Sequence, residues 1–301
     1  MNNPALVCQA YAFATVVLWS TAYVYTKVAL AFFTPGPLGL VRCAVASLAF
    51  LVLLPVTGHG NSKGNGRGGF FVPAARHLPL FAASGLSGFT LYLLAFNAGS
   101  ISLNPTTNCI VISTAPILTA ALARVVFNEQ LPVLRWLALA LAFCGVVLMN
   151  GGGSGFMLAP GMGWVLVAAV LLGLYNIVQR GLSRHYGPVQ IAAWSFFAGT
   201  LFLLYCLPQT VAEMQAAPAH ALWLALFLGI FPSAAAYLCW TKALAVAPRT
   251  SVVTNYMFLT PFLSMLLDFA VRGGLPEAST FAGGAVILGA LLLFSLAGKR
   301  G

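Results

Sequence analysis

Two ionisable side chains lie inside long apolar stretches of the sequence, where a charge needs either a function or a partner. The first is Arg42. A charged side chain within hydrocarbon costs roughly 2.5–3.5 kcal/mol on insertion scales, so it faces the protein interior and is a candidate for function. Its guanidinium could hold a carboxylate through two parallel hydrogen bonds. The alternative is an Arg that snorkels to the interface or ties helices together, and the sequence leaves both open.

The second is Asp268, the acidic residue that lies well inside an apolar run. A desolvated carboxylate binds protons more readily, which makes Asp268 a candidate for a coupled proton. Arg272 follows it at the i,i+4 spacing of one helical turn, and that spacing favours a plain ion pair. The sequence favours the ion pair and keeps proton coupling as the alternative.

Several aromatic and amide side chains fall near the middle of the apolar runs. Interface belts account for many membrane Trp and Tyr residues, but a mid-span phenol or indole needs a hydrogen-bonding partner, which a wet cavity supplies. Amides in spans could bind solute, or could cross-link helices for about 0.6 kcal/mol each. We predict a substrate cavity lined by Arg42 and by Trp19, Tyr92, Asn108, Tyr175, Tyr237 and Asn255.

Prolines within apolar runs predict bends. Pro116 and Pro261 each leave one helical carbonyl without its usual donor, which kinks a helix or gives it a hinge. Kinks also occur in helix bundles that do not move, so the hinge role is a hypothesis that transport measurements would test.

The composition fixes the kind of element that must position these residues. The chain has 301 residues, of which 60% are hydrophobic and 6% are charged, and its mean hydropathy is +0.95. Soluble domains carry about 25% charged residues, so a soluble globular enzyme is excluded. The apolar runs are continuous rather than alternating, which excludes an outer-membrane β-barrel. The sequence therefore predicts an all-α integral membrane protein.

Apolar runs bounded by Gly, Pro or charged residues predict ten membrane-spanning helices, at 6–29, 35–56, 76–98, 104–125, 131–150, 159–180, 187–207, 219–242, 249–271 and 276–297. With a cytoplasmic N-terminus, only Lys27 and Arg272 of the 14 basic residues fall outside, Arg42 lies within a span and the rest are cytoplasmic. This positive-inside bias places both termini in the cytoplasm. The net charge of +10 then reflects loops facing anionic lipids, and needs no nucleic acid.

The second half of the chain repeats landmarks of the first. Tyr92 aligns with Tyr237 and Pro116 with Pro261, both at 145 residues, while Lys27 aligns with Arg180 at 153. An odd number of five spans per copy makes the second copy inverted in the membrane, and such repeats place a solute site between the copies near the midplane. We predict two five-helix repeats, at 1–150 and 151–301.

Several stretches resemble the drug/metabolite transporter superfamily, in its ten-span EamA-type branch. They are LWSTAYVYTK (18–27), VRCAVASLAF (41–50), APILTAALARVVFNEQL (115–131), AAYLCWTKAL (235–244) and TPFLSMLLDFAVRGGLP (260–276). The resemblance implies a ten-helix bundle working by alternating access, usually in a bacterial inner membrane and often exporting amino acids or related metabolites. One departure is Gly273-Gly274, where many members carry a second Glu.

The sequence favours a secondary active or facilitative transporter and not an enzyme. It contains no nucleotide-binding, metalloprotease or nucleophile-elbow motif, and its 4 carboxylates are few for intramembrane catalysis such as lipid modification. No cofactor or metal is predicted, and the expected partners are a small-molecule substrate, membrane lipids and, as a coupling candidate, protons. We expect export of amino acids or related carboxylate-bearing compounds; the alternative is a multidrug or quaternary-ammonium exporter. A cavity within one chain allows a working monomer.

Overall fold

The computed structural model describes residues 4–57, 72–128, 133–149, 160–246, 255–273 and 277–297. All regular secondary structure in these residues is helical. Seven continuous helical stretches are long and apolar enough to cross a membrane, namely Leu6–Ala29, Pro35–Leu54, Ala75–Ser102, Pro105–Val126, Pro160–Leu182, Pro188–Ala216 and Ala219–Trp240. This is the composition of an integral membrane protein, as the sequence predicted.

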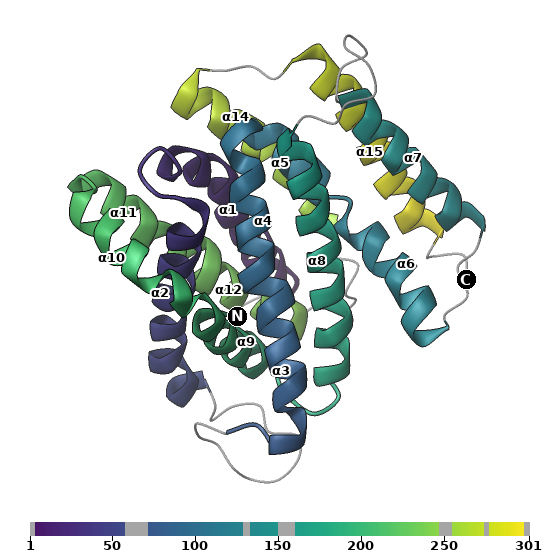
Figure 1. Cartoon of the computed structure of the whole chain (residues 1–301). Helices are drawn as coiled ribbons and strands as arrows, with labels where there is room; N and C mark the ends of the chain where they lie inside the picture. The colour runs from purple at the N-terminus through teal and green to yellow at the C-terminus, as the bar shows by residue number, and fades with distance from the viewer. Residues whose placement is uncertain are drawn as a thin grey trace.

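Figure 1 shows the helices of the first half. They are α1 (Pro4–Ala29), α2 (Pro35–Thr57), η1 (Ala75–His77), α3 (Leu78–Gly85), η2 (Leu86–Thr90), α4 (Leu91–Ser102), α5 (Pro105–Ile112), α6 (Ala115–Phe127) and α7 (Val133–Met149). The stretch from η1 to α4 is one continuous rod, within which η2 is π-helical.

The described elements of the second half follow in a similar order. They are α8 (Pro160–Leu182), α9 (Pro188–Leu203), η3 (Leu204–Cys206), α10 (Leu207–Ala216), α11 (Ala219–Leu228), η4 (Gly229–Ala235), α12 (Ala236–Val246), η5 (Asn255–Leu259), α14 (Thr260–Arg272) and α15 (Ala278–Ala297). The segments η3 and α10 are an additional extension after α9. Here η4 is the π-helical segment, and it contains Pro232.

A described helix lies within each of the ten predicted ranges, and most ends agree to a few residues. One end is wrong. The seventh predicted span stops at 207, whereas the helix continues through η3 and α10 to Ala216. Pro208 misled the prediction, because it lies at the first turn of α10, where a proline costs no helical hydrogen bond.

The two halves break their helices at corresponding positions. The π-helical segments η2 and η4 end at Thr90 and Ala235, which are 145 residues apart. Helices α6 and α14 are both 13 residues long, and each has a Pro in its first turn. Their first residues are 145 residues apart in the sequence. Each is followed by a left-handed residue, Asn128 with φ 53° and Gly273 with φ 70°. Both residue types tolerate this conformation.

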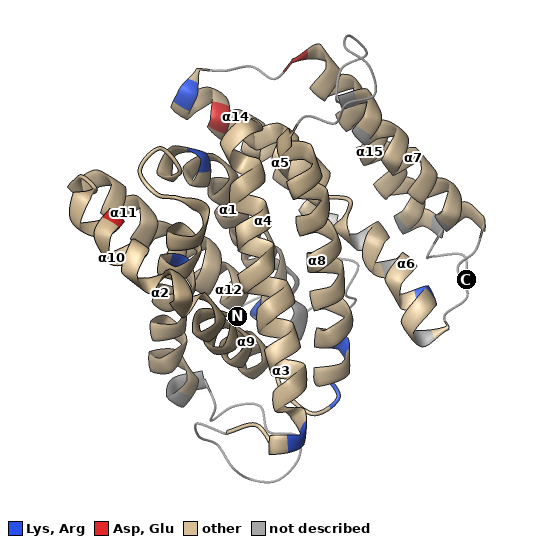
Figure 2. Ribbon diagram, viewed as in Figure 1, with Lys and Arg blue, Asp and Glu red and all other residues tan. Residues whose placement is uncertain are grey.

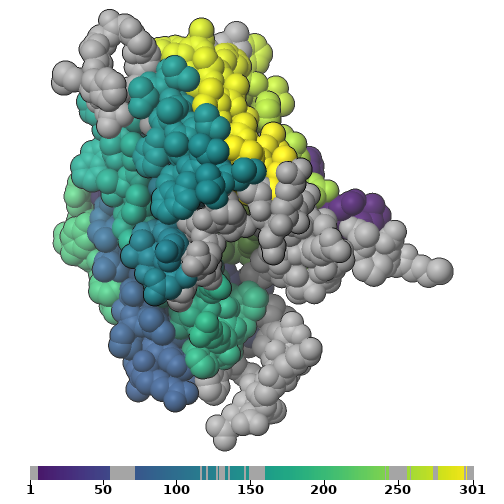
Figure 3. Space-filling view, turned by 90° about the vertical axis from the view of Figure 1, so that its right-hand side faces the viewer, coloured from purple at the N-terminus to yellow at the C-terminus, as the bar shows by residue number. Residues whose placement is uncertain are grey.

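The helix contacts also occur in corresponding pairs. Helix α4 packs against α8 and α12 packs against α1, while α6 packs against α8 and α14 against α1. Two further pairs join elements that occupy the same place in each half, α2 with α9 and α7 with α15. Figure 1 shows α4 beside α8 in the centre and α7 beside α15 to one side. In Figure 3 the yellow surface of α15 borders the teal surface of α7.

Charged residues are few and lie mostly toward helix ends (Figure 2). Glu213 of α10 accepts hydrogen bonds from the backbone N–H of Thr34, at 2.9 Å, and from its hydroxyl, at 2.7 Å. This ties α10 to the start of α2. Elsewhere, the His77 ring nitrogen lies 2.8 Å from the Tyr186 hydroxyl, and the ring stacks on His185 with centroids 4.6 Å apart. The described residues contain no group of three or more metal-ligating side chains.

Candidate functional site

Arg42 lies where α2 packs against the π-helical segment η4. A Cβ atom added to Gly229, the first residue of η4, would lie 2.6 Å from the Cβ of Val45 and 3.3 Å from the carbonyl oxygen of Arg42. Only a glycine lets the two backbones approach this closely. The glycine therefore fixes η4 directly against the turn of α2 that carries Arg42.

The Arg42 side chain is buried and incompletely paired. Its residue is 6% exposed. One guanidinium nitrogen donates to the hydroxyl of Thr26 on α1 at 3.3 Å, and the buried Nε has no hydrogen-bonding partner among the described residues. A buried guanidinium without a counter-ion is costly, because it has lost its hydration without gaining an opposite charge. This is the chemical feature of the site that most calls for a ligand.

Three phenol groups lie within electrostatic range of this guanidinium. They belong to Tyr23 of α1, Tyr92 of α4 and Tyr237 of α12. Tyr92 and Tyr237 each follow a π-helical segment by two residues, and both lie within electrostatic range of the same charge. Phenol hydroxyls both donate and accept hydrogen bonds, and can therefore line a site for a polar group.

A connected set of aromatic rings continues from Tyr237. The Trp19 ring lies 5.9 Å from Tyr237 and 5.2 Å from Trp240. On its other sides, Tyr237 meets Phe196 at 5.6 Å and Phe89 at 6.0 Å. Aromatic rings at these separations attract one another. We call this set of rings, Trp19, Tyr237, Trp240, Phe196 and Phe89, the aromatic wall.

Tyr175 joins the same wall from α8. Its ring lies 5.4 Å from that of Phe89, and it is 3% exposed. A Cβ atom on Gly88 would lie 2.2 Å from the Tyr175 ring, so η2 accepts this ring only because position 88 is a glycine. The site thus combines one buried cation with a wall of rings drawn from both halves of the chain.

The comparisons with known proteins identify the family of this chain. The model of the EamA-like transporter family matches residues 7–151 and, again, residues 159–296. The chain belongs to the EamA-like transporter family. Both matches together cover nearly every described residue, including all the residues of the site.

Two relatives of this EamA-like chain are named as an exporter and a transporter. It is 29% identical over 283 residues to a probable terminal-alkyne amino-acid exporter of Streptantibioticus cattleyicolor, covering 93% of this chain and 91% of the relative. It is 25% identical to the uncharacterized transporter YdfC of Bacillus subtilis, covering 90% and 85%. A solved crystal structure is similar in fold, with a TM-score of 0.63, 18% sequence identity and 97% coverage of both chains.

The fold brings five of the seven predicted cavity residues into one neighbourhood, namely Arg42, Trp19, Tyr92, Tyr175 and Tyr237. Asn108 of α5 is buried, donates to the hydroxyl of Ser100 and keeps an unpaired side-chain oxygen among the described residues. Its hydrogen bond to Ser100 joins it to α4 and not to the aromatic wall. The side chain of Asn255 lies outside the described residues. Whether any of the seven binds solute stays a prediction.

Sequence reasoning missed three contributors to the site. Thr26 accepts a hydrogen bond from Arg42. From the sequence we considered the charge of the next residue, Lys27, and not the hydroxyl of Thr26. Phe89 and Phe196, whose ring centroids are 3.8 Å apart, connect Tyr175 to Tyr237. Phenylalanine is so common in apolar runs that composition gives no signal for it. The glycines around Phe89, in GLSGFT, were the one available clue to close packing.

Asp268 forms the ion pair that its spacing predicted. Its Oδ1 lies 3.3 Å from a guanidinium nitrogen of Arg272, and the Asp268 residue is 4% exposed. Lys27 of α1 lies within electrostatic range of both residues and donates to the carbonyl oxygen of Ile101. These charges gather where α1 and α14 end.

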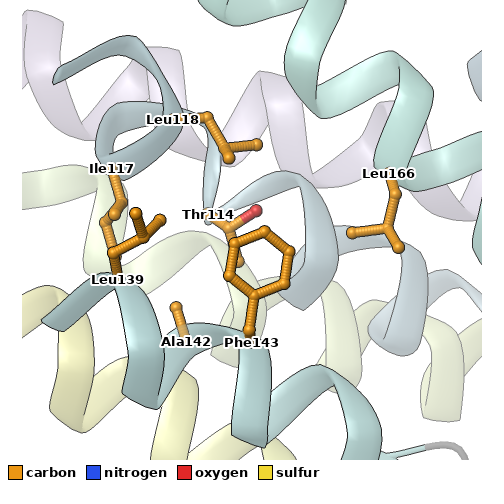
Figure 4. Close-up of a pocket in the computed structure, with 7 residues that line it drawn as sticks. All are labelled: Thr114, Ile117, Leu118, Leu139, Ala142, Phe143 and Leu166. Carbon is orange, nitrogen blue, oxygen red and sulfur yellow. The ribbon is translucent and has the colours of Figure 1, made fainter. Parts of the chain in front are cut away.

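The structure also contains a pocket that is separate from Arg42. It lies where α6, α7 and α8 approach one another, and apart from one hydroxyl its lining is apolar (Figure 4). The lining residues are Thr114, Ile117, Leu118, Leu139, Ala142, Phe143 and Leu166. Such a surface suits hydrocarbon chains rather than a polar metabolite, so Arg42 and the aromatic wall remain the candidate functional site.

Proposed function

We propose that this protein is a secondary active or facilitative transporter that exports small carboxylate-bearing metabolites, amino acids or their relatives, across a bacterial inner membrane. The observation that carries the proposal is the buried, incompletely paired Arg42 beside Tyr92 and Tyr237. A carboxylate supplies the missing charge and can accept two parallel hydrogen bonds from a guanidinium. The relative named as a probable amino-acid exporter supports the same substrate class.

The proposed architecture is ten spans arranged as two inverted repeats, 1–150 and 151–301, with both termini in the cytoplasm. Two separate family matches, the breaks 145 residues apart and the paired helix contacts support the repeats. The distribution of Lys and Arg supports the orientation. Alternating access then follows from motion of one repeat against the other around a site between them, and one chain supplies the whole site.

The hinges of this motion are assigned to Pro116 and Pro261. The helical path is broken just before α6 and just before α14. Pro116 lies in the first turn of α6, and Pro261 lies in the first turn of α14. A break removes helical hydrogen bonds, so the backbone can bend there at lower cost. The corresponding position of the two breaks supports a shared mechanical role.

A cationic drug is a weaker candidate for this site. The rings that would bind a quaternary ammonium by cation–π contact include Tyr92 and Tyr237, and both lie within electrostatic range of Arg42. A cation there would be repelled by the guanidinium. The positive charge of the site therefore favours a carboxylate over the drug alternative.

The test is solute exchange by purified protein in proteoliposomes. Labelled amino acids and other carboxylates, together with one cationic drug, would be presented to vesicles preloaded with the same solutes, with and without a proton gradient. We expect saturable exchange of at least one carboxylate solute. Transport of the drug alone, or formation of a new chemical product, would contradict the proposal.

The same assay decides the role of Asp268. Because its carboxylate is engaged by Arg272, we expect Asp268→Asn to leave the exchange rate and its pH dependence unchanged. If the variant instead lost accumulation driven by a proton gradient while keeping exchange, Asp268 would be the proton carrier and the transporter would be proton-coupled.

A further inference from the structure

The charges of the described residues are unevenly placed around the candidate site. Among them, Glu213 binds Thr34, Asp268 binds Arg272, and Glu277 lies 3.4 Å from the hydroxyl of Ser279. None of these carboxylates lies within ion-pair distance of Arg42. The neighbourhood of Arg42 therefore holds one positive charge and, in the described part of the chain, no negative one.

From this imbalance we infer that the preferred solute is a net anion, a carboxylate whose neighbouring carbon carries no free ammonium group. N-acylated amino acids and 2-hydroxy acids belong to this class, and ordinary zwitterionic amino acids do not. The inference rests on the proposed function for its site, and it narrows the substrate from carboxylates in general to carboxylates without a second, positive charge.

The physical reason is the cost of an ammonium group beside Arg42. The two charged groups of an α-amino acid are only a few bonds apart, so a carboxylate bound to Arg42 brings its ammonium close to the same guanidinium. Like charges in a buried site repel strongly, because little water screens them. The ammonium would also lose its hydration and find no carboxylate in return.

The aromatic wall fits the remaining part of such a solute. From Tyr237 partly exposed rings continue through Trp19 to Trp240, and the buried rings of Phe196 and Phe89 pack against Tyr237 from the core. A hydrocarbon side chain or an acyl group gains from contact with these rings without needing a polar partner. The geometry therefore points to an amphipathic monoanion, with its carboxylate at Arg42 and its apolar part toward the rings.

The experiment uses four probes that share one side chain and differ in charge. Leucine is zwitterionic, N-acetylleucine and 2-hydroxy-4-methylpentanoate are anions, and leucinamide is a cation at pH 7. Purified full-length protein would be titrated with each, and the apparent Kd taken from ligand-induced thermal stabilisation. We expect both anions to bind about tenfold tighter than leucine or more, and leucinamide to bind more weakly still.

Substitutions of Arg42 test whether the preference for anions depends on this residue. Arg42→Gln should abolish the difference between the anions and leucine, whereas Arg42→Lys, which keeps the charge, should retain part of it. Ser195→Ala is the matched control, because Ser195 lies at the corresponding junction of the other half and contacts Ser84 rather than Arg42. It should leave the order of the four probes unchanged. If Arg42→Gln failed to fold, the Lys variant would still report the role of the charge.

The outcomes separate this inference from the proposed function. Leucine binding as tightly as N-acetylleucine, or tighter, would overturn the inference while leaving an amino-acid transporter intact. Binding of none of the four probes at millimolar concentration would overturn it as well. Tight binding of both anions without any exchange in proteoliposomes would support the inference and contradict the transport proposal.

Discussion

Two junctions occupy corresponding places in the two halves of the molecule, yet only one carries a charge. Where α9 packs against α3 and η2, the hydroxyls of Ser84 and Ser195 lie 2.7 Å apart, and Thr90 donates to the carbonyl oxygen of Gly199 at 3.1 Å. Where α2 packs against η4, Arg42 has one hydroxyl partner and an unpaired Nε among the described residues. The first junction satisfies its polar groups internally.

The difference between the two junctions lies in their polar groups. Both junctions use close contact between a helix and a π-helical segment, so both can serve the same packing role. A buried charge at only one of them makes the site asymmetric, and π-helical segments are often found at functional sites. The serine junction is therefore the structural reference, and the arginine junction is the proposed binding site.

The test with the largest expected effect on transport replaces Arg42 by serine, so that the arginine junction resembles the serine junction. We expect Arg42→Ser to lower the initial rate of carboxylate exchange by about 10–100-fold, because hydrogen bonds to charged groups contribute roughly 1.5–3 kcal/mol. Proteoliposome exchange measures this rate, and thermal unfolding in detergent checks that the variant is folded. An unchanged rate would remove the distinction between the two junctions.

A second test concerns the helix breaks that the two halves share. Replacing Pro116 and Pro261 together by Ala should slow exchange severalfold, because longer uninterrupted helices bend less readily. Each single variant serves as the control for the pair, and apparent affinity should change less than maximal rate. If the double variant transported as fast as the parent protein, the breaks would be static kinks.

A third test concerns close packing at the arginine junction. Gly229→Ala places a Cβ atom 2.6 Å from the Cβ of Val45, and overpacking of this kind costs about 1–3 kcal/mol of unfolding free energy. Gly163→Ala on α8 is the matched control, because a Cβ there meets nothing within 4 Å. Denaturant or thermal unfolding in detergent would compare them. Equal stability of the two variants would show that α2 and η4 can separate without cost.

The smallest test concerns the serine junction. Ser195→Ala should lower the unfolding free energy by about 1 kcal/mol, since it leaves the buried hydroxyl of Ser84 without its partner. The double replacement Ser84→Ala, Ser195→Ala should cost less than the sum of the singles, because no polar group is then orphaned. Transport should be unaffected in all three. A large loss of transport would assign this junction a functional role too.

Much of the fold was predictable because it depends on the length and continuity of apolar runs. A described helix occupies each of the ten predicted ranges, and the repeat landmarks Tyr92 and Tyr237 both lie within electrostatic range of Arg42. Prediction failed at Pro208, where a proline begins a helical turn instead of ending the helix. The sequence also gave no reason to choose Thr26 as the residue that holds Arg42, since hydroxyls in membrane helices commonly bond their own backbone.

By itself, the sequence determined three properties of this chain. It is an integral membrane protein, its helices begin near the predicted residues, and few of its charged residues lie within apolar runs. These properties follow from composition, because hydrocarbon selects for apolar length and against charge. The tertiary structure decided which mid-span groups meet. A helix that is apolar on all sides carries no pattern to say which face is inward, so the meeting of Arg42, Thr26 and Tyr237 depends on how each helix is rotated by its packing.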